Sequence, residues 1–121
     1  MSDIEYLLHA RRSVVYSGET LELAKDHFRN LLKNGAQVHD NFGVVIALEN
    51  VIRPGAYRAW ILFDAVSRNT ARSIEKMLND FVGDCVIAET DNRGMRNILT
   101  RLGFRVIDVV GKDYHLLYSR S

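Results

Sequence analysis

Two runs rich in β-branched and aromatic residues, joined by a proline-glycine turn, constrain the fold of this chain most. The runs cover residues 42–51 and 56–66, with Arg53-Pro54-Gly55 between them. Val, Ile, Phe, Tyr and Trp favour extended backbone, and proline followed by glycine favours a turn. We therefore expect an antiparallel hairpin at the centre of the fold.

A helix and a strand follow this hairpin. Asn69 or Thr70 can cap the free amides at the start of the helix, and Gly83 marks its end. Spacings of three and four place its apolar residues on one face, namely Ile74, Met77, Leu78 and Phe81. With a short strand over residues 85–89, the segment 56–89 predicts a strand, a right-handed crossover helix and a parallel strand.

The C-terminal third repeats the pattern. Asp91 or Asn92 caps a helix that Gly103 closes. The residues spaced for its buried face are Met95, Ile98, Leu99 and Leu102. Residues 104–110 and 114–118 then predict a last hairpin around a glycine-containing turn.

Two helical patterns precede the central hairpin. The first begins at Ile4, and the second runs from Leu21 to Leu32 and ends at Asn34-Gly35. The complete order is helix, helix, strand, strand, helix, strand, helix, strand, strand. This order predicts one domain over residues 1–121 with an α/β (α+β) fold, a mixed central sheet flanked by helices.

Composition excludes several classes of protein. The formal net charge of +1 creates no field that would make nucleic acid or an anionic membrane the main partner. The apolar stretches are far shorter than the roughly 18 residues needed to cross a bilayer. The residues Met1 to Glu5 are acidic where a secretory signal is basic, so we expect a cytoplasmic protein.

Cysteine and histidine offer little chemistry. Cys85 is the single cysteine, and its place in an apolar run predicts a buried, inert thiol. The histidines show no metal-ligand spacing with Cys85 or with one another, so we predict no metal site. The cluster Arg93, Arg96, Arg101 and Arg105 is either a solvated helix face or a site for a phosphate or polyanion.

The element order from the second helix to the C-terminus resembles the GNAT superfamily of N-acyltransferases. In that fold two central parallel strands splay apart and admit acyl-coenzyme A. The most specific similarity lies in residues 89–104, where a strand end, an Asn, an amphipathic helix and a closing Gly-Phe follow one another. Asn92, Gly103 and Phe104 occur there at the family's spacing.

The resemblance implies that acetyl-coenzyme A binds along residues 56–66 and the loop that follows. The implied contact residues are Phe63, Ala65, Val66, Arg68, Thr70, Ala71, Arg72, Ser73 and Asn92. Helix N-terminal amides, Arg68 and Arg72 suit a pyrophosphate. However, Ala71 and Ser73 stand where the family has glycines, which hinders close backbone approach. The other interpretation of this segment is an ordinary capped helix.

The catalytic residues are also suggested by the resemblance. The family often has a Tyr four residues before the closing Gly, which protonates the leaving thiolate, but this chain has Leu99. Tyr114, or else Tyr118, can replace it. Carboxylates at or near strand ends can take the proton of an amine, and the candidates are Glu89, Asp64 and Glu49. We assign Tyr114 and Glu89 as the candidate acid and base.

Two functions remain open on the sequence. One is transfer of an acetyl group from acetyl-coenzyme A to an amine of a small molecule or protein. The other is a non-catalytic module that keeps the fold and binds a partner, as in degenerate GNAT-like proteins encoded by bacteriophages. An exposed edge in the last hairpin would also support a homodimer.

Overall fold

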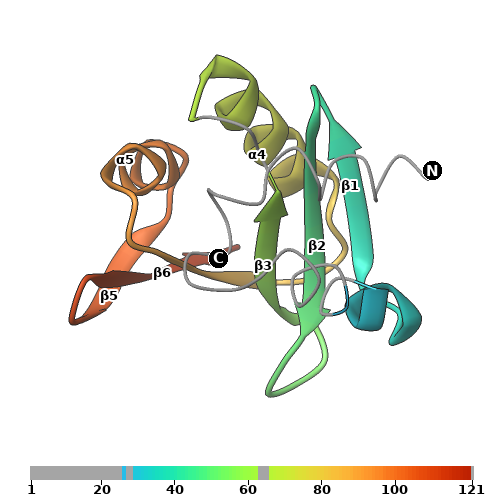
Figure 1. Ribbon diagram of the computed structural model, residues 1–121. Helices are drawn as coiled ribbons and strands as arrows, with labels where there is room; N and C mark the ends of the chain where they lie inside the picture. The colour runs from blue at the N-terminus through green and yellow to red at the C-terminus, as the bar shows by residue number, and fades with distance from the viewer. Residues whose placement is uncertain (1–25, 27–28, 63–65, 121) are drawn as a thin grey trace.

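The computed structural model describes residue 26 and residues 29–62 and 66–120 (Figure 1). The first predicted helix and most of the second lie outside the described residues. The end of the second helix is described and is confirmed at Gly35, whose φ is 83°. The amides of Gly35 and Ala36 donate to the carbonyls of Leu32 and Leu31, which completes the last turn.

The described strands form one mixed sheet in the spatial order β1-β2-β3-β4-β6-β5. The elements are β1 (Gln37–Asn41), β2 (Val44–Asn50), β3 (Ala56–Leu62), α4 (Arg68–Asp80), β4 (Cys85–Thr90), α5 (Arg93–Arg101), β5 (Arg105–Val110) and β6 (Asp113–Ser119). Only the β3–β4 pair is parallel among these strands. The predicted α+β fold, its two hairpins and its strand–helix–parallel strand unit are confirmed.

Strand β1 was not predicted, and the expected strand over 42–51 is wrong at its start. Phe42 and Gly43 instead form a tight turn with φ of 58° and 74°. Two successive positive φ values are typical of the two-residue turn that matches strand twist. The residues of β1 are mostly polar because β1 is an edge strand whose alternate side chains reach solvent.

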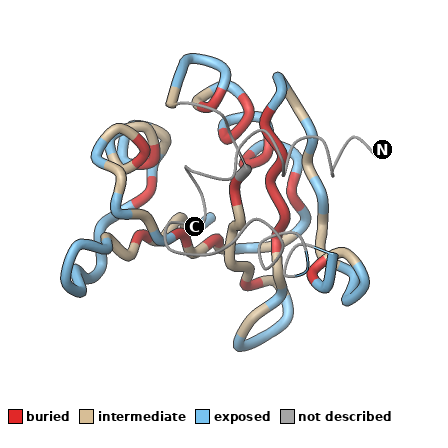
Figure 2. Tube along the Cα trace, in the orientation of Figure 1, coloured by how far each residue is buried: buried red, intermediate tan, exposed pale blue. Residues whose placement is uncertain are grey.

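The core lies between the sheet and the two helices, which cover the same face. The predicted buried residues of α4 are buried, as are Met95 and Leu99 of α5, while Ile98 and Leu102 are partly buried. Figure 2 shows buried residues along β2 and on the inner sides of α4 and α5. Each fully buried aliphatic side chain contributes about 1.5–3 kcal/mol. None of the described helices combines the length and apolarity that a membrane span requires.

The ends of α4 differ from the prediction. Neither Asn69 nor Thr70 caps the helix, because Ser67 is the N-cap and forms a reciprocal capping box with Thr70. At the other end the helix stops before Gly83, whose role is close packing. A Cβ at Gly83 would lie 2.5 Å from Cε2 of Tyr57 and 2.8 Å from the carbonyl oxygen of Gly55.

Arg120 ties the C-terminus of the chain to the end of α4. Its guanidinium donates to the carbonyls of Leu78 (2.5 Å), Phe81 (2.8 Å) and Gly83 (3.1 Å). It also lies 3.9 Å from the centroid of the Phe81 ring. Carbonyls at a helix end lack intrahelical donors, so one charged side chain here stabilises several of them.

The outer strand β5 carries a protected edge. All of its residues are exposed, including Val106, Ile107, Val109 and Val110. Its pairing with β6 is irregular between Val106 and Asp108, and Oδ1 of Asp108 accepts the N–H of Val109 at 2.8 Å. A bulge and a carboxylate bonded to an edge amide both hinder the addition of another strand. These features do not test the predicted homodimer, which stays a prediction.

We predict that Arg120→Ala lowers the free energy of unfolding by about 2 kcal/mol. The carbonyls at the end of α4 lose their charged donor, and the Phe81 ring loses its cation–π contact. Urea denaturation measures this loss. The matched control is Arg105→Ala, an exposed arginine expected to change stability by about 0.5 kcal/mol or less. Equal losses in the two variants would contradict the role given to Arg120.

A second prediction concerns the β5 edge. Asp108→Ala frees the N–H of Val109 and removes a charge from an apolar edge, so we expect self-association that rises with protein concentration. Sedimentation velocity over a concentration series measures it. Asp113→Ala removes the same charge from the same hairpin and should sediment as the unmodified chain does. Identical behaviour of the two variants would show that Asp108 does not guard this edge.

Candidate functional site

The central parallel strands separate at their carboxyl ends. Strands β3 and β4 pair over only three residue pairs, ending at Arg58 and Ile87. Beyond this point β3 continues beside β2 to Leu62, and β4 continues beside β6 to Thr90. Figure 1 shows β3 and the β5–β6 hairpin running in clearly different directions. We call the opening between residues 59–62 and 88–90 the fork.

Backbone groups line the fork. In a regular sheet the N–H and C=O groups of residues 59–62 and 88–90 that face each other would be hydrogen-bonded between the strands. Here these two segments do not pair with each other in the described sheet. Buried backbone groups need partners, so the fork favours a ligand that can hydrogen-bond as a strand does.

Helices α4 and α5 both begin beside the fork. Helix α4 follows β3 and helix α5 follows β4, which brings the positive ends of two helix dipoles to one edge of the sheet. Val66 and Gly94 allow this approach. A Cβ at Gly94 would lie 3.2 Å from Cγ1 of Val66, so a larger residue would push the start of α4 away. This role of Gly94 was not predicted.

Asn92 is the N-cap of α5, as predicted. Its Oδ1 accepts the N–H of Met95 at 2.9 Å, and its own N–H donates to Oγ1 of Thr90 at 3.0 Å. The cap uses the side-chain oxygen, which leaves the side-chain NH₂ as the group able to donate to a ligand. Contact between Asn92 and a cofactor stays a prediction.

The small residues at the start of α4 are largely enclosed. Thr70 and Ser73 are fully buried, and Ala71 is half-buried. Oγ1 of Thr70 accepts the N–H of Ser67 at 3.2 Å, and Oγ of Ser73 donates to the carbonyl of Val44 at 3.4 Å. The hydroxyls of Thr70 and Ser73 thus make hydrogen bonds within the protein, so only the backbone amides of this segment are suited to bind a ligand.

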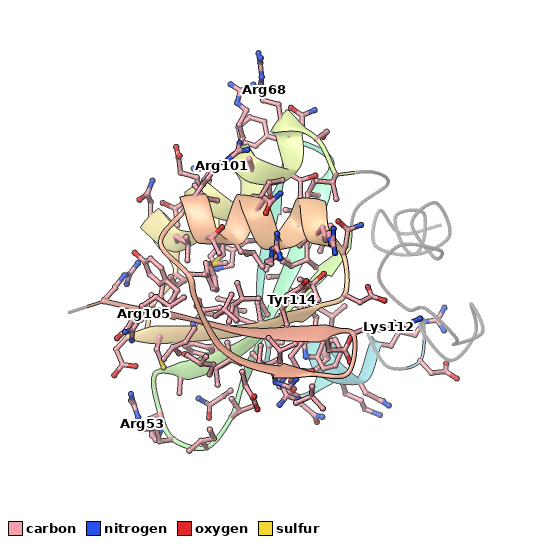
Figure 3. All side chains as sticks on the ribbon, turned by 90° about the vertical axis from the view of Figure 1, so that its left-hand side faces the viewer. Arg53, Arg68, Arg101, Arg105, Lys112 and Tyr114 are labelled. Carbon is pink, nitrogen blue, oxygen red and sulfur yellow. The ribbon has the colours of Figure 1, made fainter. Side chains whose placement is uncertain are left out.

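The first turns of α4 also carry two exposed arginines, Arg68 and Arg72. Arg68 is its first residue and lies at the far end of the molecule from Arg53 (Figure 3). The guanidinium of Arg72 stacks 4.8 Å from the centroid of the Phe42 ring. Together with the helix amides they give this edge the positive character that a phosphate group requires. The predicted contacts Phe63 and Ala65 lie outside the described residues.

Glu89, the candidate base, lies at the fork on β4. Its Oε1 is 3.7 Å from Nη2 of Arg58 and 3.7 Å from Nδ1 of His115. Its side chain is 42% exposed, so it is in contact with water. Successive residues of a strand point to opposite faces of the sheet. Ala88, which precedes Glu89, points into the core beneath α4 and α5, so Glu89 lies on the opposite face.

Tyr114, the candidate acid, lies on the other face. It pairs with Thr90 and packs against the core under α5. The guanidinium of Arg96 stacks 4.8 Å from its ring centroid, so Arg96 belongs to a packed contact and not to a purely solvated helix face. Figure 3 places Tyr114 beneath α5. The acid and the base therefore approach the same end of β4 from opposite sides.

The alternative candidates fit the site less well. Tyr118 is in an aromatic cluster, 5.5 Å from the Phe104 ring and 6.4 Å from the Phe81 ring, at the paired end of the strands. Glu49 accepts a hydrogen bond from Nε1 of Trp60 at 3.2 Å. Asp64 lies outside the described residues.

Cys85 is half-buried rather than fully buried, at the start of β4 and away from the fork. Burial, followed by its interactions with Asp84, raises the pKa of its thiol above the ordinary value. A raised pKa keeps the thiol protonated near neutral pH, which agrees with the predicted inert character. No three of the His, Cys, Asp and Glu side chains described converge on a possible metal position.

Arg58 and His115 also lie beside Glu89, and neither was predicted to lie there. A charged residue inside an apolar strand was a signal for Arg58, since residues around it at 56–62 are mostly apolar. His115 had no such signal. It reaches Glu89 only because β6 inserts between β4 and β5, which the chain order alone does not reveal.

Comparison with solved structures identifies the fold. The chain is similar to the crystal structure of the ribosomal-protein-S5-alanine acetyltransferase from Vibrio fischeri, with a TM-score of 0.63 and 16% identity, over 98% of this chain and 85% of that one. It is also similar to a GNAT-family acetyltransferase from Bacillus anthracis, with a TM-score of 0.52 and 10% identity, over 95% and 85% of the chains. No family model and no curated protein matches the sequence. The chain has the GNAT fold.

We predict that Asn92→Ala lowers the free energy of unfolding by about 1 kcal/mol, because the Met95 amide loses its cap. Asn92→Ser keeps a side-chain oxygen at the cap and should retain most of the stability. Thermal or urea unfolding of the two variants measures the difference. Equal stability of Asn92→Ala and the unmodified chain would show that the cap contributes nothing.

Proposed function

We propose that this chain is an N-acyltransferase that transfers an acetyl group from acetyl-coenzyme A to an amine. The observation that carries the proposal is the fork between β3 and β4, with the starts of both α4 and α5 beside it. The acetyltransferases with similar structures support the fold but not the acceptor, since they share 16% identity or less with this chain.

The donor would bind in an extended form. The pantetheine arm of coenzyme A carries amides, so it can hydrogen-bond to the strand groups that face the fork. Its pyrophosphate would then lie at the start of α4, near the amides of Arg68 and Asn69, which have no intrahelical acceptor. The guanidinium of Arg68 adds a charged donor, and the side-chain NH₂ of Asn92 can donate to a carbonyl of the donor.

The transfer would be direct. The amine nitrogen attacks the thioester carbonyl carbon, the new C–N bond forms, and the C–S bond breaks as coenzyme A leaves. Glu89 takes a proton from the amine, and Tyr114 gives a proton to the departing thiolate. The two residues would act on different atoms, because the base serves the amine nitrogen that adds to the carbonyl and the acid serves the sulfur that is then expelled. Positioning the reactants would supply much of the rate.

A non-catalytic binding module is the second candidate. It is favoured by Leu99, which occupies the position where the superfamily that the sequence resembles often has a Tyr, and which is only 1% exposed in the core. The buried Ser73 hydroxyl, in place of a glycine, favours it too. Such a protein would keep the fork but bind a partner protein through its surface.

Titration calorimetry with acetyl-coenzyme A tests the proposal. We expect a dissociation constant near the micromolar range, about −8 kcal/mol of binding free energy. Arg68→Ala should weaken binding about tenfold, because one charged hydrogen bond to phosphate is lost. Arg105→Ala, on the edge strand, is the matched control and should bind as the unmodified chain does.

The outcomes separate the two candidates. Binding that Arg68→Ala weakens and Arg105→Ala leaves unchanged supports a donor site at the start of α4. No heat with millimolar acetyl-coenzyme A would refute the acyltransferase and favour the binding module. Equal weakening by both substitutions would indicate a general charge effect, which places the phosphates elsewhere.

A further inference from the structure

Two nitrogen-bearing side chains from different strands converge on one oxygen of Glu89. Nη2 of Arg58 and Nδ1 of His115 each lie 3.7 Å from Oε1. We infer that Arg58 and His115 are positioning residues that hold Oε1, so that Oε2 is the oxygen presented to the acceptor amine. This inference rests on the proposed function, because it assumes that Glu89 accepts the proton of the amine.

The sheet register brings the three side chains together. Arg58 pairs with Ile87 at the last rung before the fork, and Glu89 follows two residues later on the same face. His115 lies directly opposite Glu89 on β6. Side chains opposite or diagonal to one another on one face are within contact distance. Glu89 is thus flanked from β3 and from β6, and its open side is the fork.

The surroundings of Arg58 explain why it turns toward Glu89. The residue opposite Arg58 on β2 is Glu49, whose carboxylate already accepts a bond from Trp60. Nε of Arg58 is buried and has no hydrogen-bond partner. A partly desolvated guanidinium gains more from a nearby carboxylate than a fully solvated one does.

The contacts suit a base that must be both oriented and reactive. At 3.7 Å neither contact is a direct hydrogen bond, so Arg58 holds Glu89 by its charge and His115 by its position beside it. Glu89 can therefore still adjust when substrate binds. When the amine transfers its proton, the N–H bond breaks and an O–H bond forms at Oε2. The electron pair left on nitrogen then attacks the thioester carbonyl. Arg58 and His115 bond to no reacting atom in this step.

The test compares two classes of nucleophile in an assay of thiol release from acetyl-coenzyme A. The first class is a panel of primary amines, made up of ethanolamine, lysine amide and a short peptide with a free amino terminus. These amines are largely protonated at neutral pH and therefore need a base. Hydroxylamine is largely unprotonated and does not. The variants are Arg58→Gln, His115→Gln and Glu89→Gln, with Arg105→Gln on β5 as the matched control.

We expect Arg58→Gln to lower kcat with the amines about tenfold and His115→Gln several-fold, the size of effect typical of disturbed proton transfer. Hydroxylamine turnover and acetyl-coenzyme A affinity should stay within about twofold, which also shows that the variants fold. Added to Glu89→Gln, neither substitution should cause a further loss, because both act through Glu89. Arg58→Lys keeps the charge and should recover part of the rate.

The inference and the proposed function fail in different ways. Equal losses with amines and hydroxylamine, additive losses on top of Glu89→Gln, or unchanged variants would overturn the inference alone. Turnover of hydroxylamine but of no amine in the panel would also overturn it, because no base would then be acting. No thiol release above the uncatalysed rate with either nucleophile would refute the proposed function and the inference with it.

Discussion

The short parallel pairing of β3 with β4 is the constraint on which the rest of the structure depends. It joins two antiparallel three-stranded units, β1-β2-β3 and β4-β6-β5, through only three residue pairs. The surrounding contacts reinforce this joint at its closed end. The carbonyl of Gly55 accepts the amides of Asp84 and Cys85, and Arg53 pairs with Asp84 at 2.8 Å. Because these contacts hold the first residues of β3 and β4 together, the two strands can separate at their carboxyl ends while the sheet stays intact.

The fork also determines which side chains meet at the open end of the sheet. A strand presents alternate residues to opposite faces, so Glu89 and Thr90, although adjacent, serve different sides of the sheet. The antiparallel partner β6 follows the same alternation and adds His115 to one face and Tyr114 to the other. The proposed base Glu89 and the proposed acid Tyr114 are thereby separated by the sheet itself, at the point where it opens.

Much of the fold could be predicted from the sequence because its signals are local. The turn at Arg53-Pro54-Gly55, the cap at Asn92 and the apolar spacing of α4 and α5 depend on residues a few positions apart, and the structure confirms them. The failures have different causes. Strand β1 and the true start of α4 depend on local signals that were overlooked, namely the tight turn at Phe42 and Gly43 and the capping box of Ser67 with Thr70. The packing role of Gly83 instead depends on Tyr57 and Gly55, which are distant in the sequence.

The sequence by itself determined the elements from β2 onward, their order and most of the residues that face the core, since helix and strand periodicity act over short distances. It also pointed to Glu89, Tyr114 and Arg68 as groups able to do chemistry. Only the tertiary structure decided which of them meet. The hydroxyls of Thr70 and Ser73 turned inward, and Arg58 and His115 came to Glu89, because β6 inserts beside β4 and the parallel strands part after three pairs. Strand neighbours are chosen by the packing of the whole sheet, and no short stretch of sequence contains that information.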